Sequence, residues 1–322
     1  MGTPEFAVES LRSLVENGYN VVAVVTQPDK AVGRHHEQLQ PSQVKQYAMS
    51  QGLPVLQPVK MRDPEFLEEL RGYNADLQVV VAFRMLPEVV WAMPRFGTFN
   101  VHAALLPQYR GAAPINWAVI NGETQTGVTT FFLDHDIDTG RIIMKRTFDI
   151  PDDADVEYVY DGLMHLGAEI AKDTIDMIIA NNGNIESIAQ EDEITSDTVL
   201  NAAPKIFKDT CRIDWSKSAK QVYDFVRGLS PYPGAWTEMS GSMLKIYKTK
   251  KTDQQSTGQP GEIVAEKKHL YVNCSDSLLE ILELQQSGKK RMDAVSFLNG
   301  FHVLMSEHVL DGVDTCTSIN LQ

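Results

Sequence analysis

Alternating helix and strand patterns run through residues 1–181, and they restrict the fold more than any other feature of the chain. Short apolar runs such as Val21–Val25 are typical of strands buried on both faces. Strands that alternate with helices predict a mostly parallel sheet with helices on both faces, an α/β fold. We expect a first helix through Leu11 that ends near Asn17, further helices at 42–51, 64–73, 114–120 and 155–181, and strands at 21–25, 77–83, 98–102, 127–133 and 142–148.

The pattern changes after a polar segment, residues 182–204, which we interpret as a linker. A helix near Ala219–Gly228 is followed by short strand patterns separated by polar turns, which is typical of a small β-barrel. The sequence thus predicts a first domain over 1–181 and a second over 205–322. The strands expected in the second domain are 235–239, 243–247, 261–264, 270–273 and 278–284.

The charge is distributed unequally between these parts. The 322 residues are 43% hydrophobic and carry a formal net charge of −14, which by itself argues against a nucleic-acid partner because phosphate binding needs clustered Lys and Arg. Residues 1–204 hold 14 Lys and Arg against 29 Asp and Glu, whereas residues 205–322 hold 15 against 14. The second part is therefore close to neutral and can present a basic face.

The sequence has no feature that indicates membrane insertion or disulfide bonding. No apolar run approaches the roughly 20 residues that span a bilayer, and the N-terminus lacks the basic-then-apolar order of a signal peptide. The three cysteines, Cys211, Cys274 and Cys316, are widely spaced, which fits neither a disulfide framework nor a zinc site. We expect a cytoplasmic monomer with no metal and no membrane partner.

Candidate catalytic residues lie at the end of the apolar run 98–102. Side chains two apart in a strand share a face, so Asn100 and His102 point the same way, at the sheet edge where ligands bind in open α/β folds. If the strand at 127–133 is a neighbour, a carboxylate of the acidic turn 134–140 can approach the imidazole. Such a carboxylate orients the imidazole for proton transfer, and an Asn amide can donate to an oxyanion. No Ser or Cys lies in a nucleophile-elbow context, so we expect the substrate to bring the nucleophile.

Each of these groups also has a simpler interpretation. An Asn-x-His pair at a strand end is often only a hydrogen-bonded turn. The run Asp134, Asp136 and Asp138 can form a hairpin turn, and the spacing of a calcium loop is absent. His35 and His36 more often form a solvated loop pair than a metal site. Spacing alone therefore leaves the catalytic interpretation open.

The motifs around these residues resemble those of the formyltetrahydrofolate-dependent formyltransferases. The central match is Asn100-Val101-His102 followed by Leu105–Pro114, with Asp138-Thr139-Gly140 downstream. The resemblance covers essentially the whole chain, and the set of motifs is highly specific. The further matches are Gly2–Ala7, Thr26–Lys30, Gly33-Arg34, Leu39–Ser42 and Leu229–Trp236.

The resemblance implies a Rossmann-like catalytic domain of the formyltransferase fold, followed by an OB-like barrel that helps to hold a tRNA. It implies transfer of the formyl group of 10-formyltetrahydrofolate to the α-amine of initiator Met-tRNA, for translation initiation. By the same resemblance, Asn100, His102 and Asp138 form the catalytic trio. We expect the amine to attack the formyl carbon while His102, as imidazolium, and Asn100 stabilise the oxyanion, and Asp138 to relay the amine proton.

The resemblance also places the two substrates. Family members usually carry Ser where this chain has Ala104, so a hydroxyl contact with folate is lost. The loop 27–42 resembles one that reaches the acceptor end of the tRNA, but here His35, His36 and Glu37 stand where lysines are common. The implied folate contacts are Ala104, Leu105, Leu106 and Pro107, with the pterin near Phe83, Arg84, Met85 and Leu86. The expected phosphate contacts are Arg34, Lys245, Lys248, Lys289 and Arg291.

Members of the family carry a short apolar strand directly before the turn that corresponds to Gly2-Thr3-Pro4, and here that turn opens the given sequence. Such a strand would be central in the sheet. We therefore expect the chain without it to be markedly less stable than a version extended upstream.

Two other functions remain open at this point. One is a formyltransferase for another amine, such as an amino sugar or glycinamide ribonucleotide, or a formyltetrahydrofolate hydrolase. The other is a non-catalytic OB-type RNA-binding protein with a degenerate enzyme domain, which the intact trio disfavours. The Ser230–Gly234 motif and the long 27–42 loop favour tRNA.

Overall fold

The computed structural model describes residues 1–32 and 38–306, which form two compact units. The first comprises Met1–Pro114, Gln125–Asp149 and Tyr160–Pro204, and so includes residues 182–204. Its elements are α1 (Glu5–Glu16), β1 (Val24–Val25), β2 (Lys30–Val32), β3 (Gln38–Gln40), α2 (Gln43–Ser50), β4 (Val55–Leu56), α3 (Pro64–Gly72), β5 (Gln78–Val81), α4 (Glu88–Trp91), β6 (Thr98–His102), β7 (Arg110–Gly111), β8 (Gln125–Phe132), β9 (Ile142–Asp149), α6 (Val156–Ala180, from Tyr160), η1 (Gln190–Glu193) and β10 (Ala202–Ala203).

The main sheet of the first unit has the strand order β5-β6-β8-β9. β5 and β6 are parallel, as are β1 and β4 in a separate pair, which agrees with the expected parallel α/β arrangement. β8 runs antiparallel to β6, and β9 runs antiparallel to β8. A short turn joins β8 to β9, and a short turn can join only antiparallel neighbours.

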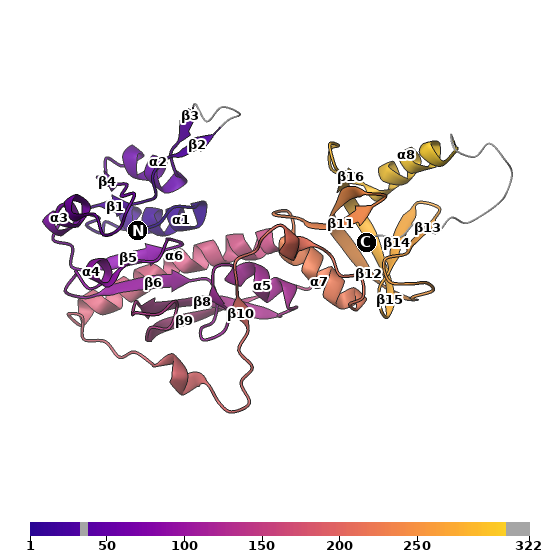
Figure 1. Ribbon diagram of the computed structural model, residues 1–322. Coiled ribbons are helices and arrows are strands. Elements are labelled where there is room, and N and C mark those ends of the chain that lie inside the picture. The colour runs from indigo at the N-terminus through magenta and orange to yellow at the C-terminus, as the bar shows by residue number, and fades with distance from the viewer. Residues whose placement is uncertain (33–37, 307–322) are drawn as a thin grey trace. The chain divides into compact units, whose positions relative to one another are not determined.

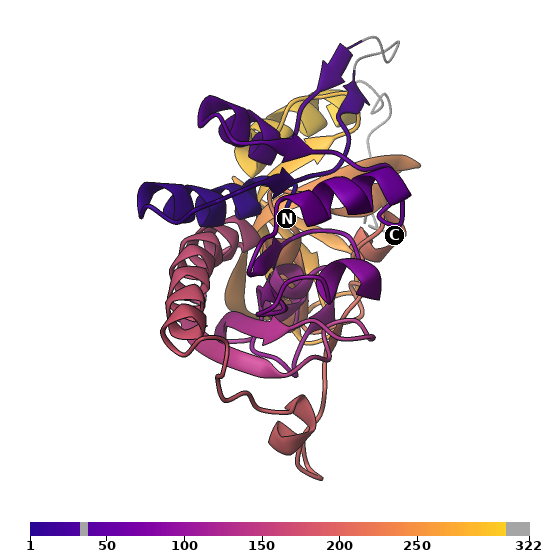
Figure 2. The same cartoon turned by 90° about the vertical axis from the view of Figure 1, so that its left-hand side faces the viewer.

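Helices cover both faces of this sheet, and Figures 1 and 2 both show α6 running along it. On the α6 face, Thr174 and Thr130 of β8 share a hydrogen bond of 2.9 Å. On the other face, α3 and α4 bury Phe66 and Val90 in one apolar cluster with Val80 of β5. The core therefore fixes β5 and β6 between two helical layers.

The segment expected as a loop over 27–42 contains a hairpin. β2 and β3 pair antiparallel, with Lys30 opposite Gln40. Arg34 lies outside the described residues, which stop at Val32 on one strand of the hairpin and resume at Gln38 on the other. At its base, Lys45 of α2 binds Asp29 at 2.7 Å.

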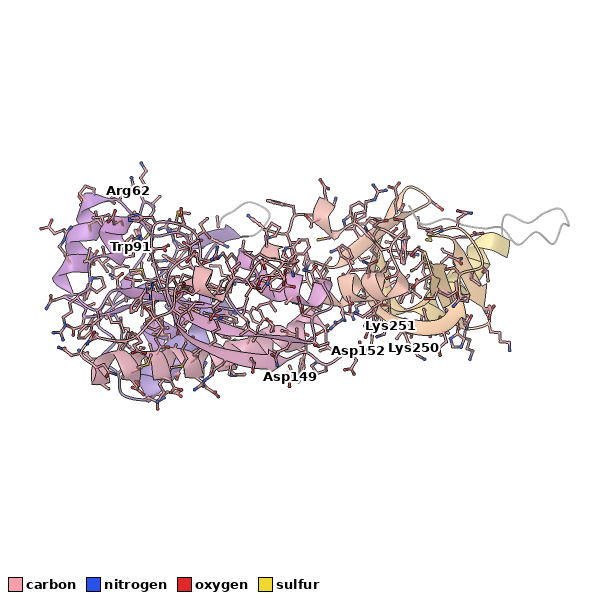
Figure 3. All side chains as sticks on the ribbon, turned by 90° about the horizontal axis from the view of Figure 1, so that it is seen from below. Arg62, Trp91, Asp149, Asp152, Lys250 and Lys251 are labelled. Atoms are coloured by element: carbon pink, nitrogen blue, oxygen red, sulfur yellow. The ribbon has the colours of Figure 1, made fainter. Side chains whose placement is uncertain are left out.

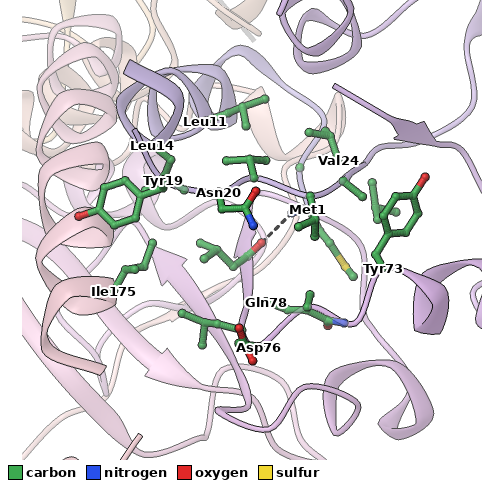
Figure 4. Close-up of a pocket in the computed structure, with 18 of the residues that line it drawn as sticks. Met1, Leu11, Leu14, Tyr19, Asn20, Val24, Tyr73, Asp76, Gln78 and Ile175 are labelled. Carbon is green, nitrogen blue, oxygen red and sulfur yellow. Dashed lines mark hydrogen bonds between the residues drawn. The ribbon is translucent and has the colours of Figure 1, made fainter. Parts of the chain in front are cut away.

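A groove of about 560 Å³ separates β1 from β5 (Figure 4). Met1 and Gly2 close one end: the Met1 amino nitrogen donates to the Val79 oxygen at 2.7 Å, and Gly2 N donates to Val25 O at 3.0 Å. Residues 21–25, expected as one strand, all line the groove, and only Val24–Val25 pair as a strand, with β4. The other apolar lining residues include Leu11, Leu14, Leu77, Ile175 and Ile179.

The second unit comprises Ile115–Thr124, Ile150–Val159 and the described residues from Lys205 onward. Its strands pair antiparallel in the order β11-β12-β15-β14-β13, with β16 on β15, as expected for the second domain. Its elements are α5 (Pro114–Ile120), η2 (Asp209–Cys211), α7 (Ala219–Leu229), β11 (Ala235–Met239), β12 (Ser242–Gln255), β13 (Ile263–Glu266), β14 (His269–Asn273), β15 (Ser277–Gln286), β16 (Met292–Asp293) and α8 (Ala294–Ser306).

Polar contacts connect the segment Ile150–Val159 to α7 and β12. Lys251 binds Asp152 at 2.7 Å (Figure 3), and its ammonium lies 4.8 Å from the centre of the Tyr223 ring. Asp224 and Arg227 of α7 form a nearly buried ion pair of 2.8 Å, and Arg227 also donates to the Ala154 oxygen. This cluster fixes α7 against its own sheet.

The two cysteines in the described residues are packing residues. Cys211 and Cys274 are buried and free. Burial raises the pKa of the Cys211 thiol, and raises that of Cys274 to about 12. Both therefore stay protonated and unreactive near neutral pH.

Candidate active site

His102 and Asn100 occupy one side of β6, as their spacing predicts. β6 lies between β5 and β8, and its residues Phe99 and Val101 are buried in the core. Alternation along the strand places the side chains of Asn100 and His102 together on the same face. β6 ends at His102, so the imidazole lies at its carboxyl end.

Both nitrogens of the nearly buried His102 ring face a polar group. Nε2 lies 2.9 Å from the Tyr109 backbone oxygen, and because a carbonyl oxygen only accepts, Nε2 carries a proton. Nδ1 lies 3.8 Å from the Asp138 carboxylate. The ring edge also packs on Phe131 of β8 at 6.4 Å between centres. The imidazole is thus held in one orientation between a carbonyl and a carboxylate.

Asp138 comes from the turn between β8 and β9. Its backbone has φ of 57°, which is uncommon for a residue with a side chain. Its Oδ2 atom accepts a hydrogen bond of 3.0 Å from Gly111 N. A Cβ atom at Gly140 would meet the Phe132 oxygen at 1.7 Å, so only glycine fits there. The Asp-Thr-Gly order therefore aims a carboxylate at His102 in a very tight turn.

The amide of Asn100 has an open hydrogen-bonding position. Its Oδ1 atom is buried and has no hydrogen-bond partner among the described residues. A buried amide oxygen without a partner is unfavourable. A substrate N–H bound beside β6 would supply the missing donor.

The loop after β6 is fixed to β8 by one hydroxyl group. Thr129 Oγ1 donates to the Ala104 oxygen at 2.7 Å and accepts from Leu106 N at 3.1 Å. Ala104 and Leu106 are fully buried, and Leu105 is half-buried. The implied folate loop is therefore rigid, and Pro107 follows it through a cis peptide bond.

The segment Phe83–Leu86 follows β5 at the sheet edge where His102 lies. Val81, the last residue of β5, pairs with Val101, the residue before His102. Arg84 donates to the backbone oxygens of Pro58 and Val59. Leu86 is buried, whereas Met85 is 69% exposed. Of this segment, Met85 presents the most apolar surface to a ligand.

Sequence reasoning missed Gln190, which lies in the expected linker. Gln190 is fully buried and contacts Arg110, Asp138 and Gly140. The only local signal is a polar run, Gln190–Glu193, and such runs are usually solvated. The contact depends on pairing between residues 80 positions apart.

In the second unit, cations and aromatic rings share one side of the strands β11 and β12. Trp236 pairs with Lys245 in register, the Arg212 guanidinium lies 5.6 Å from the Trp236 ring centre, and the Arg291 guanidinium lies 4.5 Å from that of Tyr247. We call these five residues the basic aromatic face.

The cations predicted to contact phosphate in this unit differ in whether protein groups already bind them. Lys245 donates to the Pro233 oxygen at 2.8 Å, and Arg291 binds Glu283 at 2.7 Å. Lys248 is exposed and pairs in register with Glu283, while Lys289 is exposed in the turn before β16. An acidic neighbour thus offsets part of the charge of Arg291.

Neither a metal-binding cluster nor a membrane-spanning helix is present in the described residues. Residues 1–32 and 38–306 contain no group of three or more His, Cys, Asp or Glu side chains placed to hold a metal ion. No helix in these ranges is long and apolar enough to cross a membrane.

The chain is similar to known proteins over most of its length. Residues 1–175 match the formyl transferase family, and residues 205–302 match the C-terminal domain of formyl transferases; the chain belongs to this family. Among its relatives, the methionyl-tRNA formyltransferases of Parabacteroides distasonis and Bacteroides fragilis are 59% and 55% identical to it, over 94% of this chain and 94% of each relative. The crystal structure of WlaRD, a sugar 3N-formyltransferase, shares its fold: it covers 90% of this chain and 97% of its own, with 19% identity and a TM-score of 0.62.

Proposed function

We propose that this protein transfers the formyl group of 10-formyltetrahydrofolate to the α-amine of methionyl initiator tRNA, in the cytoplasm. The observation that carries the proposal is the His102–Asp138 pair with the Asn100 amide oxygen that has no partner among the described residues. The relatives of nearly equal length bear the name of this activity. We assign the chemical step to the first unit and tRNA binding to residues 205–322.

The site residues can perform the transfer without a protein nucleophile. The Asn100 oxygen accepts an N–H of the incoming amine and so orients its lone pair toward the formyl carbon. As the new C–N bond forms, the Asn100 amide N–H donates to the developing oxyanion, and the positive charge of the His102 imidazolium stabilises it. The Asp138–His102 pair accepts the amine proton and passes it to the departing N10 nitrogen, whose bond to the formyl carbon breaks.

The rigid loop Ala104–Pro107 and the segment Phe83–Leu86 are our proposed folate-binding elements. Both leave the sheet at the carboxyl ends of the adjacent parallel strands β6 and β5, which is where ligands bind in such folds. The exposed Met85 side chain offers an apolar surface that suits a flat ring.

The basic aromatic face supports a tRNA substrate. Aromatic rings such as Trp236 and Tyr247 stack on unpaired bases, and the adjacent guanidinium groups of Arg212 and Arg291 can neutralise phosphates. A free amino acid or an amino sugar would not need such a surface.

One assay tests the proposed function. The purified chain is incubated with the formyl donor and either Met-tRNA or free methionine. We expect formyl-Met-tRNA to accumulate and free methionine to stay unmodified, and we expect His102→Ala to remove most turnover while the protein remains folded. Near-normal formylation by His102→Ala, or no formylation by the wild type, would refute the assignment.

A further inference from the structure

The amide of Gln190 connects the two loops that surround His102. Its Oε1 atom accepts from Nε and Nη2 of Arg110 at 2.9 and 2.7 Å. Its Nε2 atom donates to the backbone oxygens of Asp138 and Gly140 at 2.8 and 2.9 Å. An amide offers two lone pairs and two N–H groups, so these two loops use its whole hydrogen-bonding capacity.

The orientation of this amide is unambiguous. A guanidinium group only donates and a backbone oxygen only accepts, so Oε1 of Gln190 must face Arg110 and Nε2 must face the Asp138 turn. The side chain is fully buried, and water cannot replace these partners. A change that keeps the acceptor but removes the donors will therefore affect the Asp138 turn selectively.

Both ends of this connection are next to the His102–Asp138 pair. Tyr109, directly before Arg110, provides the oxygen that binds His102 Nε2. Gly111, directly after Arg110, donates to the Asp138 carboxylate. Asp138 has a positive φ, and its own carbonyl is one of the two that Gln190 binds. The unusual backbone that aims the carboxylate is thus held by an amide far away in sequence.

We propose that Gln190 is a positioning residue for the formyl transfer: its amide holds the Asp138 turn against the Arg110 loop, so that the carboxylate faces His102. This inference rests on the proposed function and extends it to a residue outside the trio. The hydrogen bonds of Gln190 go to Arg110, Asp138 and Gly140, so its amide acts on His102 through these residues.

The test compares two Gln→Glu variants with matched chemistry. Gln190→Glu keeps the acceptor for Arg110 but replaces both donors by an oxygen that repels the two carbonyls. Gln108→Glu is the control, because Gln108 also bridges the Arg110 loop to a distant segment. Its amide accepts from Asn201 N and donates to Val199 O, and neither hydrogen bond involves Asp138. We expect Gln190→Glu to lower kcat about 10- to 100-fold with KM for both substrates within twofold, and Gln108→Glu to keep kcat within twofold.

A second readout does not depend on turnover. Hydrogen exchange at Gly111 N–H, which binds the Asp138 carboxylate, should become faster in Gln190→Glu and stay unchanged in Gln108→Glu. Should the Glu variant fail to fold, Gln190→Met, which has a similar volume, takes its place. If the wild type does not formylate Met-tRNA, the proposed function fails, and the exchange measurement still decides the positioning role.

The outcomes separate positioning from simple stability. A variant with wild-type melting temperature, lowered kcat and faster Gly111 exchange supports the proposal. Equal kcat and equal exchange in the two Glu variants would overturn it. So would a loss of activity that consists only of a raised KM, or one that the fraction of unfolded protein explains in full.

Discussion

The Asp138 carboxylate lies 3.8 Å from Nδ1 of His102, while the other ring nitrogen binds a backbone oxygen at 2.9 Å. Neither nitrogen points into open solvent, since the side chains of His102 and Asp138 are only 6% and 14% exposed. The pair is therefore arranged to hold a proton in a fixed place.

Asp138→Asn tests the charge of this pair with little change in shape. The new amide oxygen can still accept from Gly111 N, so the turn should keep its geometry. Without the anion, the imidazolium that the proposed mechanism needs at His102 has no carboxylate to stabilise it, and we expect kcat to fall about 10²- to 10⁴-fold. Steady-state kinetics with Met-tRNA measures this, and a melting temperature close to that of the wild type serves as the control. A decrease smaller than tenfold would remove Asp138 from the mechanism.

Arg212→Ala tests the basic aromatic face. Loss of one phosphate contact should raise KM for Met-tRNA, leave kcat at saturating tRNA unchanged, and reduce the slope of log affinity against log salt by about one. Arg95→Ala is the matched control, because Arg95 also stacks on a ring, that of Phe96 at 4.3 Å, but lies in the first unit. Equal effects of the two variants on KM would contradict a tRNA contact at Arg212.

Asp224→Asn tests the ion pair inside the second unit. Asp224 and Arg227 are 3% and 7% exposed, and removing one charge from a buried pair leaves the other uncompensated. We expect the free energy of unfolding to fall by about 3 kcal/mol, measured by urea denaturation. Asp76→Asn breaks an exposed pair with Arg95 and should change it by less than about 1 kcal/mol. If the two variants are equally stable, the buried Asp224–Arg227 pair contributes no more to stability than the exposed pair.

The sequence predicted the elements whose signal is local. The strands 98–102 and 235–239 have the bounds that the sequence predicts. In the first, Phe99 and Val101 alternate with polar residues, and the second is bounded by turn residues on both sides. The spacing of Asn100 and His102 likewise placed both side chains on one face.

Features that depend on distant partners could not be predicted in this way. The burial of Gln190 depends on Arg110 and on the Asp138 turn, which no local pattern reveals. The antiparallel direction of β8 follows from its pairing with β6, and the expected strand 243–247 extends to 242–255 because it pairs with both β11 and β15. In each case tertiary contacts decide what local preference leaves open.

The buried amino group of Met1 makes stability depend on pH. Burial lowers its pKa from 8.0 to about 5. Between pH 5 and 8 the unfolded chain therefore binds a proton that the folded chain does not, so this group makes the free energy of unfolding rise with pH, by at most about 1.4 kcal/mol per pH unit. Urea denaturation at pH 5.5 and 8.0 measures this. A chain extended before Met1 has an amide there instead, and the same slope in both chains would show that other groups cause it.

The groove between β1 and β5 predicts a gain in stability when an extended apolar segment is joined to Met1. Gly2 already pairs parallel to Val81, so residues added before Met1 would continue between the two strands and bond to backbone groups on both sides. Their side chains would cover Leu11, Leu14 and Val22, which are only partly buried, and burial of apolar surface stabilises the fold.

We expect five added Val and Ile residues to raise the melting temperature by about 5 °C or more and to slow hydrogen exchange in β1 and β5. A Gly-Ser extension of equal length removes the charged amine but lacks apolar side chains, so it should give a smaller rise. If the two extended chains melt together and exchange alike, the groove does not accept a strand.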